Sequence, residues 1–252
     1  MVACSPAEFR SAIEAHRLDP IALAAEAVEA ARLAVQEAGM LVVGEPHGAR
    51  ETPGVLYFLA TELGARTVAF EWSHEEMDDA VQAFVRDGSL DLGRLWSLPA
   101  TAEFFCGDGR ITAGHFALLE RLRAEERLEH VILFDRLDPE PAPRDRQARE
   151  REMAERLLAQ WKRRGPVLVL VGAFHAQLDA DDGETMAMRL AREVPLRLAM
   201  IDYADGQLWS RGRLHDVAGP MPPAPIRLRV PLATPAVVPG NAAPPAAAAG
   251  KR

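Results

Sequence analysis

The sequence predicts an α/β fold in which a mostly parallel central sheet is covered by helices on both faces. Short, continuous apolar runs alternate along the chain with amphipathic or Ala-rich stretches of helical length. This order of strands and helices is typical of parallel sheets, because neighbouring parallel strands need a crossover connection. Hydrophobic residues make up 48% of the 252 residues and charged residues 26%, the balance of an ordinary globular protein.

Two helix-start signals open the chain. Ser5-Pro6 places a capping residue before a proline at the first helical position, and Asp19-Pro20 repeats the pattern. We expect the second helix to cover residues 21–38 and to end at Gly39 in a left-handed C-cap. Residues 1–39 should therefore form helices that pack on the domain that follows.

Residues 40–216 are expected to form the α/β domain itself. The apolar runs that predict its strands cover residues 40–43, 67–70, 130–134, 166–171 and 196–201. The patterns that predict its helices cover residues 55–63, 74–85, 114–126, 145–164 and 185–192. Residues 207–210 would form a short extra strand, and the irregular region 88–113 an insertion over one sheet edge.

The end of the chain has a different composition. Nine of the 19 prolines lie between residues 220 and 252, and the last residues are rich in alanine. Such a segment buries too little apolar surface to offset the entropy of ordering it. Residues 217–252 are therefore expected to form a largely disordered Pro/Ala-rich tail, although residues 226–232 could still dock as a strand.

Charge and motif content exclude several classes of function. The 37 acidic against 29 basic residues give a net charge of −8, which disfavours nucleic-acid binding. The sequence contains no apolar run long enough to cross a membrane, no zinc-binding cysteine pattern, no serine-hydrolase elbow and no nucleotide-binding loop. With no secretion signal visible, we expect a cytoplasmic protein whose partner is a small molecule or peptide. The sequence does not indicate an oligomeric state.

Polar or ionisable residues stand where five of the predicted strands end. They are Glu45 with His47, Glu71, Asp135, His175 and Asp202. In an open parallel sheet, ligands bind outside the carboxyl ends of the strands, so these side chains should converge on one crevice. Taken singly, each is more often a loop residue or a helix cap, and for Asp202 we favour the cap.

Two of the strand ends repeat one motif, and this repetition favours a functional site. Gly44-Glu45-Pro46-His47 and Gly172-Ala173-Phe174-His175 each follow a buried strand directly. The glycine permits a sharp turn, and the histidine three residues later can point back across the strand ends. The remaining histidines share no such context and are interpreted as surface or capping residues: His16, His74, His115, His130 and His215.

These residues are sufficient for acid–base catalysis. His47, with an ordinary imidazole pKa of about 6.5, is the expected general base. Glu45 or Glu71 would orient it or supply a second carboxylate, and His175 would act as an acid or stabilise an oxyanion. His47, Glu71 and His175 also have the donor atoms of a catalytic divalent-metal site with one open position.

Two arginines extend this candidate site. Arg149 falls on the apolar stripe of its expected helix, where a charge is costly unless it is paired. Contact with Glu71, with Asp135 or with an anionic substrate would pair the charge of Arg149. The alternative is an exposed helix arginine paired with a nearby carboxylate. Arg110 follows a turn and could reach over the site, although we slightly favour a simple turn without a functional role. The candidate substrate-binding residues are therefore Arg149, Asp135, Arg110 and Glu51.

Several segments together resemble a known superfamily. The segments 43–51 (Val-Gly-Glu-Pro-His-Gly-Ala-Arg-Glu), 63–64 and 68–73 (Val-Ala-Phe-Glu-Trp-Ser) resemble the N-terminal motifs of erythromycin esterases. Two G-x-x-H motifs with a glutamate between them are similar to those of the wider superfamily, which includes the Tiki/TraB proteases and the ChaN-like haem-uptake proteins. Residues 149–154 are similar to the Arg-(Asp/Glu)-x-x-Met-Ala signature of the ChaN and esterase branches. The resemblance covers roughly residues 40–202.

The resemblance implies a hydrolase that uses activated water on an ester, lactone or amide bond. The alternative is a ChaN-like protein that binds haem or another small ligand without catalysis. Esterase members are metal-independent and Tiki-type members metal-dependent, so a divalent ion such as Mn²⁺, Co²⁺ or Zn²⁺ stays open. The esterase-like segments are the closest matches, and we therefore favour the metal-free form.

Overall fold

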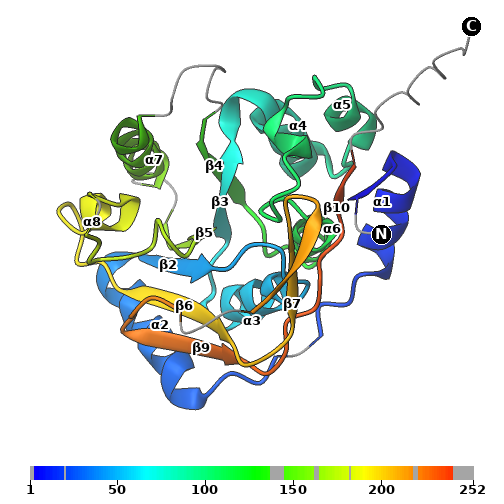
Figure 1. Ribbon diagram of the computed structural model, residues 1–252. Coiled ribbons are helices and arrows are strands. Elements are labelled where there is room, and N and C mark those ends of the chain that lie inside the picture. The colour runs from blue at the N-terminus through cyan, green and yellow to red at the C-terminus, as the bar shows by residue number, and fades with distance from the viewer. Residues whose placement is uncertain are drawn as a thin grey trace, which may run out of the picture.

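The computed structural model describes residues 3–19, 21–136, 145–161, 165–181, 183–217 and 221–240. Its centre is a sheet in which all neighbouring strands are parallel, so the predicted fold class is confirmed (Figure 1). The spatial order is β4 (His130–Asp135), β3 (Thr67–Ser73), β5 (Val167–Gly172), β2 (Met40–Glu45), β6 (Leu198–Tyr203) and β9 (Ile226–Val230).

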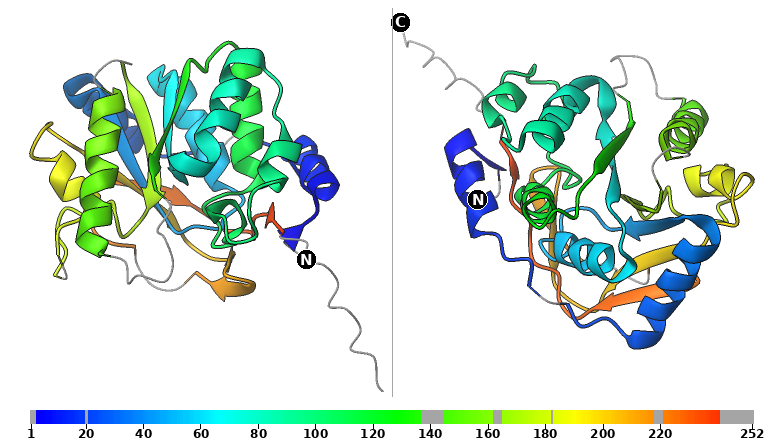
Figure 2. Two further views of the ribbon diagram at one scale, coloured as in Figure 1. Left: turned by 90° about the horizontal axis from the view of Figure 1, so that it is seen from above. Right: turned by 180° about the vertical axis from the view of Figure 1, so that it is seen from behind.

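Helices cover both faces of this sheet, and each face has its own apolar core (Figure 2). On β2, Leu41 and Val43 pack into the core of one face and Met40 and Val42 into the core of the other. Four helices belong to the first face: α2 (Ala25–Ala38), α3 (Thr52–Leu63), α4 (His74–Asp87) and α6 (Ala113–Ala124). The second face is covered by α7 (Arg146–Trp161) and α8 (Met186–Leu190). This double coverage explains why the strands are continuously apolar rather than alternating.

The first helix packs beside this unit through an aromatic cluster. α1 (Pro6–Ala15) begins at Ser5 with a full capping box, and its Phe9 lies 5.3 Å from the ring of Trp96 and 5.7 Å from that of Phe116. The irregular region contains α5 (Leu92–Trp96) and the 3₁₀ helix η1 (Glu103–Phe105), which contribute to this cluster. β1 (Ala3–Cys4) pairs with β10 (Val238–Pro239), which brings the two ends of the described chain together.

The structure corrects two boundaries. The second helix begins at Ala25 rather than at residue 21, because the Leu23 N–H donates to the Ile21 carbonyl in a tight turn. The predicted tail contains β9, which confirms that residues 226–232 could dock as a strand. It also contains β10, so the expectation of disorder is wrong for residues 221–240. In β9, Ile226, Leu228 and Val230 are buried and alternate with arginines, the pattern of a half-buried strand. Residues 241–252 lie outside the described part of the chain.

An antiparallel hairpin follows β6 and consists of β7 (Gln207–Ser210) and β8 (Arg213–Asp216). The first of these strands matches the predicted extra strand. Figure 1 shows the hairpin near the carboxyl end of β2. Among the helices of the described ranges, none is long and apolar enough to cross a membrane.

Candidate active site

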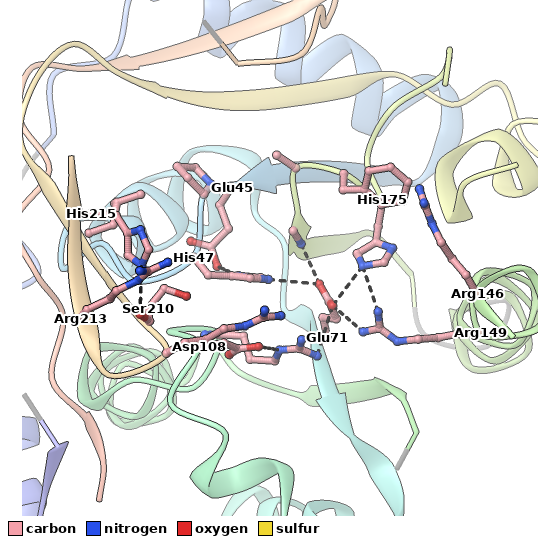
Figure 3. A pocket seen from close by; sticks show the side chains of 17 residues that line it. Glu45, His47, Glu71, Asp108, Arg146, Arg149, His175, Ser210, Arg213 and His215 are labelled. Carbon is pink, nitrogen blue, oxygen red and sulfur yellow. Dashed lines mark hydrogen bonds and ion pairs between the residues drawn. The ribbon is translucent and has the colours of Figure 1, made fainter. Parts of the chain in front are cut away.

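A cavity of about 740 Å³ opens at the carboxyl ends of β2, β3 and β5 (Figure 3). This is the place where ligands bind in open parallel sheets. The structure brings His47, Glu71 and His175 together there, as the sequence predicts. The cavity is lined by Glu45, Pro46, His47, Glu71, Asp108, Arg110, Arg146, Arg149, Gly172, Ala173, Phe174, His175, Leu208, Ser210, Arg211, Arg213 and His215.

Glu71 lies at the centre of the site. Its side chain extends from β3 and is buried, and one oxygen, Oε2, accepts a hydrogen bond of 2.7 Å from the Gly172 N–H. The other oxygen, Oε1, accepts a hydrogen bond of 2.7 Å from Nη2 of Arg149 and lies 3.3 Å from Nη1 of Arg110. Both oxygens are therefore engaged by fixed donors, which holds the carboxylate in one orientation.

Each histidine of the two motifs is held between a second glutamate and Glu71. His47 Nδ1 lies 3.0 Å from Glu45 Oε1, and its Nε2 lies 3.6 Å from Glu71 Oε2. His175 Nδ1 lies 2.6 Å from Glu150 Oε1, and its Nε2 lies 3.4 Å from Glu71 Oε1. The two histidines approach Glu71 from opposite sides (Figure 3).

Glu150 is a site residue that sequence reasoning missed. It is fully buried on α7, and its second oxygen, Oε2, accepts a hydrogen bond of 2.7 Å from the Met186 N–H. A signal was present, because Glu150 shares one helical face with Met153, Ala154 and Leu157, all of them buried. A glutamate on such a stripe must have partners. Here the partners are a histidine and a helix N-terminus.

Asp135 accepts hydrogen bonds from Arg110 and Arg149 and does not line the cavity. Its Oδ1 accepts a hydrogen bond of 3.0 Å from Arg149 Nε, and its Oδ2 accepts one of 3.0 Å from Arg110 Nη1. Arg110 also donates to Asp108 at 2.7 Å and to Glu103 at 2.6 Å. The expectation that Asp135 contacts substrate is therefore corrected, whereas both arginines do line the cavity.

The structure also places Glu51 outside the cavity. Its carboxylate accepts hydrogen bonds from the backbone N–H and the hydroxyl of Thr234, and so ties the start of α3 to the chain after β9. Conversely, His215, interpreted from the sequence as a surface residue, does line the cavity. It belongs to the β7–β8 hairpin, which also contributes Ser210, Arg211 and Arg213. No motif pointed to these hairpin residues.

Charge pairing shifts the pKa values at the centre of the site. Burial lowers the pKa of His47, but the hydrogen bond to Glu45 and the contacts with Glu71 outweigh it and raise the pKa to about 10. For His175, burial again lowers the pKa, and the stronger effects of Glu71 and Glu150 raise it overall. Burial raises the pKa of Glu71, but the neighbouring His175 and the guanidinium groups hold it well below its usual range. At neutral pH, Glu71 is charged and His47 is an imidazolium.

The donor atoms of this site fit neither a divalent metal ion nor the iron of a haem bound through His47 and His175. The described residues include no group of three or more acids, histidines or cysteines with the geometry to hold a metal ion. A divalent cation at Glu71 would also lie beside Arg110 and Arg149, which already contact its carboxylate. For haem iron, the imidazole Nε2 atoms of His47 and His175 would be the ligands, and both face Glu71.

No protein-family model matches the chain, and no curated protein matches its sequence. Its structure is similar to a crystal structure of a protein from Bacillus cereus, with a TM-score of 0.56, 13% identity and coverage of 86% of this chain and 80% of that one. This likeness shows the fold alone.

Two further matches have lower TM-scores. The type III effector HopBA1 matches with a TM-score of 0.42, at 15% identity over 77% of this chain and 94% of that one. ChaN of Campylobacter jejuni, which binds haem cofacially, matches with a TM-score of 0.46, at 11% identity over 75% of this chain and 92% of that one.

Proposed function

We propose that this protein is a hydrolase that cleaves an ester, lactone or amide bond, using two Glu–His pairs for acid–base chemistry. One observation carries the proposal: the Nε2 atoms of His47 and His175 lie 3.6 and 3.4 Å from the same carboxylate, inside one cavity. Hydrolysis by water needs a base for the attacking water and an acid for the leaving group. Two imidazoles on opposite sides of one cavity can supply both.

The hydrogen bonds favour His175 as the base. A guanidinium has only N–H donors, and Arg149 Nη1 lies 3.2 Å from His175 Nε2. This contact is a hydrogen bond only when Nε2 carries a lone pair, which places the proton on Nδ1, where Glu150 accepts it. In this neutral form, His175 can take a proton from a water that displaces Arg149 Nη1 from the Nε2 lone pair.

His47 is then the acid rather than the base. The role expected from the sequence relied on an ordinary imidazole pKa, whereas Glu45 and Glu71 raise the pKa of His47 to about 10. As an imidazolium it would stabilise the negative oxygen that forms when water attacks, and then donate its proton to the leaving group. Glu71 acts as a positioning residue for both imidazoles, and Arg149 and Arg110 fix Glu71.

This assignment predicts a bell-shaped dependence of kcat/KM on pH. The rising limb follows deprotonation of His175, whose pKa is shifted upward, and the falling limb follows deprotonation of His47 at a pH of about 10. A rate that falls steadily above pH 7 would contradict it.

The direct test is hydrolysis of a neutral ester, 4-nitrophenyl butyrate, and of the matching anilide and a γ-lactone. His47→Ala and His175→Ala should each lower kcat/KM about 100-fold or more, because a general acid or base contributes about that factor. His130→Ala is the matched control, since His130 lies at the opposite end of β4 from the site. Equal rates in all three variants and the wild type would refute the proposal.

A further inference from the structure

The cavity contains more positive charge than its chemistry requires. Of the five arginines that line it, Arg110 and Arg149 are neutralised by contacts with Glu71 and Asp135. Arg211 and Arg213 add two further positive charges to its lining, and Arg146, which also lines it, has interactions of its own. The chain as a whole carries a net charge of −8, so this local excess of positive charge runs against its composition.

Two of these arginines lie at the tip of the β7–β8 hairpin, Arg211 in the turn and Arg213 at the start of β8. The backbone fixes this hairpin beside the site. The Trp209 N–H donates to the carbonyl of Gly48, the residue after His47, at 3.2 Å, and the Arg211 N–H donates to the Gly107 carbonyl at 2.8 Å. Gly48 has a φ of +95°, and a Cβ there would collide with the Trp209 carbonyl. The close approach that glycine permits thus holds the turn against the loop that carries His47.

Arg211 and Arg213 differ from Arg110 and Arg149 in their partners. Within the described ranges of the chain, no ion pair joins Arg211 or Arg213 to a carboxylate. Arg213 Nε donates a hydrogen bond of 3.3 Å to His215 Nε2. Figure 3 shows Arg213 and His215 on the His47 side of Glu71, and Arg146 on the far side. Arg146 is stacked on the Phe174 ring at 3.8 Å.

We propose that Arg211 and Arg213 bind an anionic group of the substrate, a carboxylate or a phosphate, at the His47 end of the cavity. A guanidinium presents paired N–H donors that match both groups. An anion held there would place the rest of the substrate across Glu71, between the acid and the base. This inference rests on the proposed hydrolase function and names its substrate class.

The kinetic test compares two esters with the same leaving group, neutral 4-nitrophenyl butyrate and anionic 4-nitrophenyl hemisuccinate. The wild type should have the higher kcat/KM for the hemisuccinate. Arg213→Ala should lower that value about tenfold through KM and lower the butyrate value much less, because a hydrogen bond to a charged group is lost only for the anion. Arg229→Ala is the matched control, an exposed arginine on a strand outside the cavity. Hydrolysis of both esters without a preference, and with no effect of Arg213→Ala on the ratio, would refute the anion site and leave the hydrolase standing.

A binding measurement tests the same site without turnover. Calorimetric titration of the full chain with inorganic phosphate and with succinate should detect binding of at least one, weakened about tenfold by Arg213→Ala and not by Arg229→Ala. The tighter of the two ligands identifies the anion as phosphate or carboxylate. Absence of binding by either, or weakening by Arg146→Ala but not by Arg213→Ala, would overturn the inference. Because no catalysis is needed, this result is independent of whether the proposed hydrolase activity is found.

Discussion

Replacing Glu71 with glutamine tests whether one buried carboxylate holds the site together. The substitution keeps the shape of the side chain and removes its charge. A glutamine has one acceptor oxygen, and its NH₂ group can only donate. With the oxygen toward Arg149, the NH₂ would face the Gly172 N–H, and with the opposite orientation it would face the guanidinium. One buried donor loses its acceptor in either case.

The magnitude follows from these contacts. A buried donor without an acceptor costs about 1–3 kcal/mol. Removing one partner of a buried, hydrogen-bonded ion pair costs about 3–5 kcal/mol, and this figure already includes the lost hydrogen bonds. We therefore expect Glu71→Gln to lower the free energy of unfolding by about 3–5 kcal/mol at pH 7. Because a domain is stable by about 5–15 kcal/mol, the variant should still fold.

Urea unfolding followed by circular dichroism measures this loss. The matched control is Glu129→Gln, which breaks an exposed pair: Glu129 lies 2.6 Å from Arg66, and its side chain is 51% exposed. A surface pair contributes about 0–1 kcal/mol, so the control should change little. A loss in Glu71→Gln no larger than that in the control would refute the idea that Glu71 organises the site.

The pH dependence of the difference in unfolding free energy between wild type and Glu71→Gln gives a second check. The pKa of Glu71 is held well below its ordinary value of 4.5. The stability that the charged Glu71 carboxylate contributes is therefore fully present above pH 4.5. It is lost as the pH falls through the pKa of Glu71 in the folded state. The gap in stability between wild type and Glu71→Gln should be constant between pH 7 and about 5 and should narrow below that. A gap that widens on acidification would contradict the assignment.

Three further predictions concern the same centre. The folded-state pKa of His47 is about 10 against an ordinary 6.5, so its stabilising effect is lost as the pH rises between these values, and His47→Gln should flatten the fall of Tm over that interval. Dialysis against EDTA should leave kcat/KM unchanged, and a loss that Mn²⁺, Co²⁺ or Zn²⁺ restores would show that the histidines and Glu71 do hold a metal ion. Gly172→Ala would place a Cβ 2.8 Å from His47 Nε2, so kcat should fall tenfold or more while the circular dichroism spectrum stays unchanged. The control Gly93→Ala, in α5, should have little effect on kcat.

The fold and the centre of the site could be predicted because they depend on local patterns. Each parallel strand is a continuous apolar run, and each run ends where a polar side chain must meet water or a ligand. Glu45, Glu71 and His175 all stand at such ends, on strands that the structure places side by side. Their convergence therefore follows from the fold class. The roles assigned to them stay predictions.

The parts that could not be predicted depend on contacts between distant segments. The pKa of His47 is raised by Glu45 in the same loop and also by Glu71 on another strand, and the sequence offers no measure of the distance to Glu71. Glu51 lies in the same sequence motif as His47, but the Glu51 carboxylate lies outside the cavity, where it accepts a hydrogen bond from Thr234. Arg213 joins the site only because backbone hydrogen bonds place a hairpin beside Gly48. None of these pairings leaves a periodic signal.

The strand register explains how the two G-x-x-H motifs come together. β2 and β5 are neighbours, and Glu45 lies opposite Gly172, so the first glycine of the second motif stands beside the glutamate of the first. Gly172 has no side chain, and the space above it is taken by His47 Nε2 and by Glu71 Oε2, to which its N–H donates. A larger residue at this position would separate the imidazole from the carboxylate. The glycine thus serves as the point of contact between the two motifs, and the histidine three residues further along each strand end can then reach Glu71 from its own side.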